Sequence, residues 1–346
     1  MRTKAIVIGI VAVATTGSGV LGQTSSAPRT PAASSGWSVP RLADGRPDLQ
    51  GVWENNSATP LERPRELANT PRLTEAEVEA MRRKAGTVFG PESDAVFGDA
   101  LYLALLDENR PRQLGATGTY SSNWLPDRFF EPRTSLIESP ANGRLPPITP
   151  ENARLRASRA TVPVERPASA ADLSLQDRCI SYGVPDLFAA YMSLYRIVQA
   201  PDVVAIEMEK IHDVRVVPLN GRPALPASFT HYMGDARGRW EGDTLVVETA
   251  NFHPAGNYMG GLFRQSDANL KLTERFTLVG PDTLRYEFTV NDPDTYTRPW
   301  TAAFNLDSKD GYEIYEYACH EGNYGLANML SAARAEERAA AQPPKR

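Results

Sequence analysis

Short runs of alternating apolar and polar residues dominate the second half of the chain. A period of two residues predicts strands with one buried face. Eight such runs are predicted as strands: Tyr195–Ala200, Val203–Ile211, Val214–Leu219, Thr244–Phe252, Leu270–Val279, Leu284–Asn291, Trp300–Leu306 and Tyr312–Cys319. Turn residues such as Glu241-Gly242-Asp243 separate them, and connections this short join antiparallel neighbours. We therefore predict a mainly β fold at residues 195–322, an antiparallel barrel or strongly curled sheet that encloses side chains or one small ligand.

Residues 37–194 lack a comparable alternation. Thr74–Glu77 has the pattern of a capping box that begins a short helix, and Thr149–Glu151 begins another with proline at its first position. Gly51–Trp53 and Arg133–Glu138 have the character of short strands. Because a long coil is unusual inside a compact domain, we interpret this region as an irregular arm that wraps the sheet. Residues 323–346 are predicted to form a closing helix and a frayed tail.

The chain begins with the pattern of a secretory signal peptide. Residues 1–23 place Arg2 and Lys4 before the apolar run Ala5–Ala14 and end in small residues. An apolar run of about ten residues is too short to span a bilayer, which needs roughly 20. Residues 24–36 are rich in Ser, Ala, Pro and Thr and predict a flexible linker. We expect a periplasmic or secreted protein that has no transmembrane segment after signal cleavage.

The charge balance bears on the class of partner. The 42 acidic residues outnumber the 37 basic ones, which disfavours nucleic-acid binding because that depends on basic surface. We expect a small molecule as the partner, and the sequence does not indicate an oligomeric state.

Cys179 and Cys319 are the two cysteines of the chain. In an exported protein such a pair predicts a disulfide, and two separate buried thiols are the alternative. The predicted bond joins the arm to the last predicted strand.

The densest polar chemistry lies at the end of that last strand. His320 and Glu321 follow it directly, and a second cluster is formed by His212 and Asp213. We expect these two clusters and the segment around Cys179 to meet in space. Imidazole titrates near neutral pH and an adjacent carboxylate fixes its tautomer, so these four residues are the candidate catalytic residues. A zinc or iron ion between His212 and His320 is one alternative, although close ligand spacing is absent; a purely structural polar network is another.

Other residues are candidates for substrate binding. Glu274 lies on the apolar stripe of Leu270–Leu278 and requires a partner from another strand, because burial of an unpaired charge is costly. Trp240 and Trp300 flank turns and either pack in the core or line a ligand cavity. The full set is Arg215, Trp240, Glu274, Trp300, Glu316, Tyr317 and Asn323. The sequence has no glycine-rich phosphate loop, nucleophile elbow or His-Glu-x-x-His motif, which disfavours nucleotide-dependent transferases, serine hydrolases and zinc proteases.

Several segments of the chain combine into a specific pattern. They are Pro47–Trp53, Arg133–Glu138, Asn142–Glu151, Ile211–Pro218, Gly238–Glu248, Thr297–Thr301 and Tyr315–Asn323. Together they resemble a large family of exported bacterial proteins of unknown function, over most of residues 40–335. The resemblance offers no catalytic residues. Gly51–Trp53 and Trp240–Leu245 are also similar to lipocalin-like (calycin) barrels, which implies binding of a small, partly apolar molecule.

Three functional hypotheses follow. The first is a cofactor-independent lyase, isomerase or hydrolase that acts on a small, partly apolar or sugar-like molecule by acid–base chemistry in a barrel cavity. The second is a lipocalin-like binding module that uses the barrel mouth with Trp240 and Trp300. The third is a structural envelope protein. The first requires His212 and His320 to converge on a solvent-reachable cavity, the second a cavity without such groups, and the third no cavity.

Overall fold

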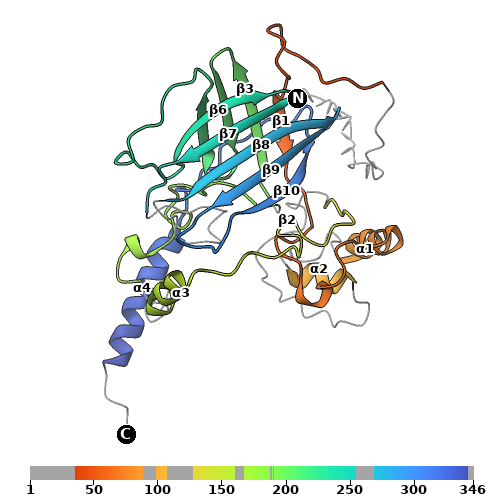
Figure 1. The fold of residues 1–346 in the computed structure, drawn as a ribbon. Helices are drawn as coiled ribbons and strands as arrows, with labels where there is room; N and C mark the ends of the chain where they lie inside the picture. The colour runs from red at the N-terminus through yellow and green to blue at the C-terminus, as the bar shows by residue number, and fades with distance from the viewer. Residues whose placement is uncertain are drawn as a thin grey trace, which may run out of the picture. The chain divides into compact units, whose positions relative to one another are not determined.

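Nine strands form one antiparallel sheet that curls into a nearly closed barrel (Figure 1). The computed structural model describes residues 36–88, 99–106, 128–159, 167–187, 189, 191–254 and 269–341. In spatial order the strands are β5 (Asp213–Pro218), β4 (Val203–Met208), β3 (Leu194–Ala200), β1 (Gly51–Glu54), β10 (Trp300–Ser308), β9 (Thr283–Asn291), β8 (Lys271–Gly280), β7 (Thr244–Ala250) and β6 (Asp235–Glu241). The short β2 (Ile137–Ser139) pairs with β10 beside this path. The predicted mainly β, antiparallel barrel is confirmed.

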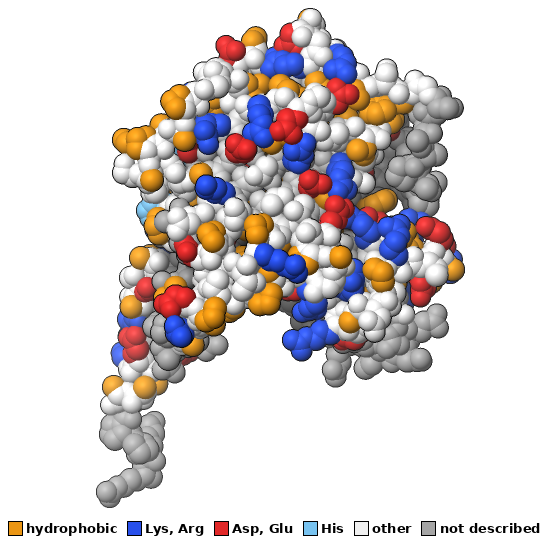
Figure 2. Space-filling model, viewed as in Figure 1, with side chains coloured by type: hydrophobic (Ala, Val, Ile, Leu, Met, Phe, Trp, Pro, Cys, Tyr) orange, Lys and Arg blue, Asp and Glu red, His pale blue; other side chains and the backbone are white. Residues whose placement is uncertain are grey.

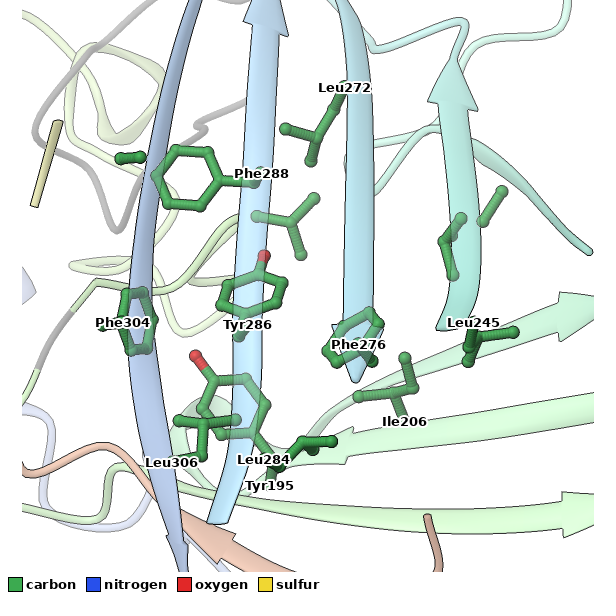
Figure 3. Close-up of a cluster of buried hydrophobic side chains, with 14 of the residues drawn as sticks. Tyr195, Ile206, Leu245, Leu272, Phe276, Leu284, Tyr286, Phe288, Phe304 and Leu306 are labelled. Atoms are coloured by element: carbon green, nitrogen blue, oxygen red, sulfur yellow. The ribbon is translucent and has the colours of Figure 1, made fainter. Parts of the chain in front are cut away.

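The inner face of the sheet is filled with side chains. Burial alternates residue by residue along β8 and β9, as their sequence periodicity predicts. Figure 3 shows Phe276, Tyr286, Phe288 and Phe304 in this interior cluster, with Phe276 and Tyr286 stacked at 4.8 Å between ring centroids. The hydrophobic cluster extends over nearly every strand. The barrel interior is therefore a packed core.

Four α-helices accompany the sheet in the described residues: α1 (Glu75–Val88), α2 (Asp99–Leu106), α3 (Pro150–Arg159) and α4 (Tyr324–Ala340). Single 3₁₀ turns are η1 (Arg65–Leu67), η3 (Ala170–Asp172) and η4 (Lys210–His212). The predicted capping box is present, since Thr74 N donates to Glu77 and Glu77 N donates to Thr74 Oγ1. The Asn323 side chain accepts from Leu326 N and begins α4. The predicted helix starts are confirmed.

The prediction of a strand at Tyr312–Cys319 is wrong. Residues 312–318 have no regular secondary structure. The physical reason is that β10 already pairs with β9 on one side and with β1 and β2 on the other, so the ladder has no place for a following strand. Side chains hold the segment instead, as where Tyr312 Oη donates to Glu209 Oε1 at 2.9 Å. The alternation of this segment therefore does not place its side chains on the two faces of a strand.

Other strands also differ from the predictions. The short strand predicted at Arg133–Glu138 is β2, which spans Ile137–Ser139. The strand predicted at Val203–Ile211 ends at Met208, because Ile211 and His212 have φ values of 56° and 53°, a left-handed conformation that a strand does not contain. Strand β6 was not predicted. Residues 1–35, which include the predicted signal peptide and nearly all of the linker, lie outside the described residues, as does the tail at 342–346.

The barrel has a seam between β5 and β6, the two strands at the ends of the sheet. Every ladder is antiparallel and nine strands form the path, so β5 and β6 run in the same direction. No ladder joins them within the described part of the chain. Val217 and Leu219 pack against Gly238 at this seam, where an added Cβ would lie 2.8 and 2.6 Å from their side chains. Side-chain packing therefore closes the wall at this end of the seam.

Candidate functional site

The three polar segments singled out by sequence do meet. Cys179 and Cys319 form a disulfide with a Cα–Cα distance of 5.6 Å, which confirms the predicted bond. Asn323 Nδ2 donates to the Asp177 carbonyl at 3.0 Å. His212 Nδ1 lies 3.2 Å from the Tyr317 carbonyl. The segment after β10 is thus joined both to residues 177–179 and to η4.

The two histidines of this region lie at the surface. His212 is exposed, and His320, Glu321 and Glu316 are exposed around the turn that precedes α4. Where the structure describes the chain, no three His, Cys, Asp or Glu side chains come close enough to hold a metal ion. Of the four candidate catalytic residues, Asp213 is the one that lines the cleft described below.

Glu274 has the partner that its apolar surroundings require. The carboxylate is fully buried and receives Arg215 Nη1 at 2.8 Å and Nη2 at 2.5 Å. Tyr286 Oη donates to the same carboxylate at 2.7 Å. Burial lowers the pKa of Arg215, but the charge and hydrogen bonds of Glu274, together with Tyr286 and Tyr195, raise it by more in sum, so the guanidinium stays charged. The prediction of a partner from another strand is confirmed, and the pair belongs to the barrel interior.

Trp300, Trp240 and Asn323 make structural contacts. Trp300 is fully buried and packs edge-on against Phe288 at 5.7 Å. Trp240 is partly buried against the same core. Asn323 caps α4, and Tyr317 is half-buried with its carbonyl facing His212. Neither tryptophan is among the residues that line the cleft described next.

A cleft of about 460 Å³ opens at the seam between β5 and β6. Its walls come from the first residues of both strands, from residues 180–181 and from the connection before β6. Its lining consists of Ile180, Ser181, Asp213, Val214, Arg215, Val216, Arg222, Leu225, His231, Tyr232, Met233, Gly234, Asp235 and Ala236. Sequence reasoning named two of these, Asp213 and Arg215, but did not find the cleft, because its walls come from separate loops.

The walls of the cleft expose apolar side chains. Val214 and Val216 on the outer face of β5 are 54% and 61% exposed. Other strands carry cross-strand ion pairs on their outer faces, as between Arg239 and Glu248 and between Arg275 and Glu241. Figure 2 shows basic and acidic side chains interspersed in this manner over the face in view. The outer face of β5 at the cleft therefore differs in character from the ion-paired faces.

Asp213 is the acidic group of the cleft with no ion-pair partner among the described residues. Its Oδ2 accepts from Ser181 Oγ at 3.0 Å and from Tyr182 N at 2.8 Å. Burial raises the pKa of Asp213 above its ordinary value, although these hydrogen bonds act in the opposite direction. The other charged side chains of the cleft are paired, Arg215 with Glu274 and Arg222 with Asp235.

No family model, no curated protein and no solved structure matches this chain. Functional assignment therefore depends on the geometry of the cleft and its surroundings.

A buried lysine lies close to the cleft in sequence and was not predicted as a functional residue. Lys210 Nζ lies 4.8 Å from the ring centroid of Tyr182 and 4.7 Å from that of Tyr191. Burial lowers its pKa to about 7, although the charges of Asp186 and Glu209 act against this. The sequence could have indicated this lysine, because continuing the alternation of β4 beyond Met208 places Lys210 on the same face as Ile206 and Met208. A basic residue on an apolar stripe is the same kind of signal that identified Glu274.

Proposed function

We propose that the protein binds a small, partly apolar molecule in the cleft between β5 and β6. The observation that carries the proposal is a cleft of about 460 Å³ whose walls expose Val214 and Val216 and whose polar groups include Asp213, which has no ion-pair partner where the chain is described. Ligand sites of proteins are concave, mostly apolar and contain a few placed polar groups, with volumes of roughly 300–1,000 Å³. The proposed site lies in the wall of the barrel, since aromatic side chains fill the interior.

Exposed valines on an edge strand support the same proposal. An unpaired edge with apolar side chains promotes aggregation, and proteins commonly protect such edges with charges. Here the neighbouring outer faces carry ion pairs and β5 does not. A bound ligand would cover Val214 and Val216 and shield their apolar side chains from water.

Acid–base catalysis in the same cleft is the second candidate function. It is favoured by one observation: Asp213, with its raised pKa, and His231 both line the cleft. A carboxyl group whose pKa is moved toward neutrality is suited to general acid–base work. The two candidates differ in outcome, because a binding module releases its ligand unchanged and an enzyme releases a product.

We also propose export to the periplasm or secretion. The Cys179–Cys319 disulfide supports this location, since disulfides persist in oxidising compartments. No described helix is both long enough and apolar enough to cross a membrane. Mass spectrometry of the protein purified from its host tests the proposal, with cleavage near Gly22 or Gln23 as the expected result and an intact N-terminus as the contrary one.

The cleft is tested by blocking it. Val216→Lys places a charge in the cleft, and Val198→Lys is a matched control because Val198 is 48% exposed on β3 and does not line the cleft. A library of small aromatic and aliphatic compounds is screened by ligand-observed NMR, and product formation is followed in the same samples. We expect compounds that bind the wild type and Val198→Lys but not Val216→Lys. Equal binding by all three proteins contradicts the proposed site.

A further inference from the structure

The charges of the cleft do not balance. Arg215 is neutralised by Glu274 below the cleft, with side chains 3% and 0% exposed. Arg222 is neutralised by Asp235. Asp213 remains as a carboxylate that forms no ion pair with a described residue, and its neighbour in sequence, His212, is exposed and faces the Tyr317 carbonyl. When Asp213 is ionised, the cleft carries an excess negative charge.

The carboxylate of Asp213 is placed to receive a ligand. The hydrogen bonds from Ser181 and Tyr182 both go to Oδ2, the backbone of Gly183 acts on the same carboxylate, and Asp213 lines the cleft. Those bonds also fix the orientation of the carboxylate, which reduces the entropy that binding costs. Ile180, Val214 and Val216 line the same cleft and supply apolar surface to it.

We propose that the ligand of this cleft is an organic cation, an ammonium group joined to an apolar body. The inference rests on the function proposed above and names its ligand class. The ammonium pairs with Asp213, and the hydrocarbon part covers Val214, Val216 and Leu225. A hydrogen bond between opposite charges is roughly twice as strong as a neutral one, and pairing removes the penalty of a half-buried, unpaired carboxylate.

An anionic ligand is a poorer match to the same surface. It would lie beside Asp213, and the two guanidinium groups of the cleft, Arg215 and Arg222, are already paired with Glu274 and Asp235. The Nε of Arg215 lacks a hydrogen-bond partner, but it is buried and out of reach of the solvent. A charge left unpaired on displacement of either carboxylate would oppose binding.

Three probes of similar shape and different charge test the ligand class. They are 2-phenylethylamine, 2-phenylethanol and 3-phenylpropanoate, and each is titrated into the full-length mature protein by calorimetry and ligand-observed NMR at pH 7.5. We expect the amine to bind on the order of tenfold more tightly than the alcohol, and the carboxylate to bind most weakly. We also expect the preference for the amine to decrease at high salt.

Two variants test whether Asp213 is the source of the preference for the amine over the alcohol. Asp213→Asn keeps a hydrogen-bond acceptor for Ser181 and Tyr182 but removes the charge, and we expect it to lose the tenfold preference for the amine. Asp202→Asn is the matched control, because Asp202 is an exposed acid in the β3–β4 turn and does not line the cleft; it should keep the preference. If Asp213→Asn does not fold, the comparison of the amine and the alcohol on the wild type still tests whether the ligand is a cation.

The outcomes separate this inference from the proposed function. Equal affinity of the amine and the alcohol, with both lost in Val216→Lys, overturns the cationic ligand and leaves the cleft as the binding site. A preference for the amine that persists in Asp213→Asn overturns the role of Asp213. If no probe binds and Val216→Lys has no effect on any compound of the library, both proposals are wrong.

Discussion

Arg215 of β5 and Glu274 of β8 form a bidentate ion pair inside the barrel, with nitrogen–oxygen distances of 2.8 and 2.5 Å. The two strands share no ladder, so the pair links parts of the wall that the sheet does not join directly. Tyr286 and Thr249 complete the network, since Tyr286 donates to Glu274 and Arg215 Nη2 donates to Thr249 Oγ1. Burial raises the pKa of Tyr286 well above its ordinary value, and the nearby Glu274 charge adds to this, so its hydroxyl remains a donor.

Removal of one member of this pair should be strongly destabilising. Glu274→Leu leaves Arg215 charged in an apolar interior, and we expect it to lower the free energy of unfolding by about 3–5 kcal/mol. The double variant Arg215→Met with Glu274→Leu should recover most of that loss, because it buries no charge. Urea denaturation of the wild type, both single variants and the double variant forms the cycle. Additive losses would show that the two residues do not act as a pair.

Reduction of the disulfide should destabilise the fold without abolishing it. The bond closes a sequence separation of 140 residues, for which the chain-entropy model predicts about 5 kcal/mol. We expect dithiothreitol to lower the urea midpoint of the wild type and to leave that of Cys179→Ala with Cys319→Ala unchanged. Alkylation without reductant should label no thiol in the native protein, and two labelled cysteines would contradict the bond.

Lys210 should make stability rise with pH above neutrality. Its folded-state pKa is about 7, below the ordinary value of 10.5, so between these values the unfolded state holds one proton more than the folded state. The free energy of unfolding therefore increases from about pH 7 toward pH 10.5, and the full penalty of burial applies below pH 7. Lys210→Met should flatten this dependence. Lys271→Met is the control, since Lys271 is exposed, and it should retain the wild-type profile.

Gly238 should be intolerant of a side chain. A Cβ at this position would lie 2.6 Å from Leu219 Cδ2 and 2.8 Å from Val217 Cγ1, so Gly238→Ala overpacks the seam. We expect a loss of about 1–3 kcal/mol, the usual cost of overpacking. Leu219→Ala in the same protein should recover part of it by making space. Thermal unfolding of the two single variants and the double variant measures the effect, and a neutral Gly238→Ala would mean that the seam is loosely packed.

The parts of the fold that sequence predicted are those governed by local periodicity. β8 and β9 agree with their predicted limits to within one residue because each strand alternates and has one buried face. Tyr312–Cys319 also alternates, but a strand requires a partner, and β1 from the distant N-terminal half occupies the place beside β10. β6 was missed because Arg237, Gly238 and Arg239 interrupt its apolar pattern. Which distant segments pair as neighbouring strands depends on the whole fold, so local periodicity does not predict it.

In the candidate site, too, sequence predicted the features that depend on local pattern and missed those that depend on the whole fold. Sequence could show that Glu274 needed a cation, because one charge on an apolar stripe is a local observation. It could not identify Arg215, since that depends on how the sheet curls. Asp213 was named beside His212, yet its surroundings in the cleft come from residues 180–181 and 222–236, which no short spacing connects. The positive φ of His212 turns the chain between these neighbours, so the two do not share the cleft.

The odd number of strands in the barrel has a kinetic consequence. Elsewhere around the wall, separation of two strands breaks a ladder of backbone hydrogen bonds, but separation of β5 from β6 breaks side-chain contacts such as that of Val217 with Gly238. The wall of the barrel should therefore open between β5 and β6 before it opens between any two strands that a ladder joins. Amide protons of β5 and β6 that face each other should exchange with deuterium sooner than those of β8 and β9, which have neighbours on both sides. Transient widening there would give a ligand of the cleft a route in and out that leaves the rest of the sheet undisturbed.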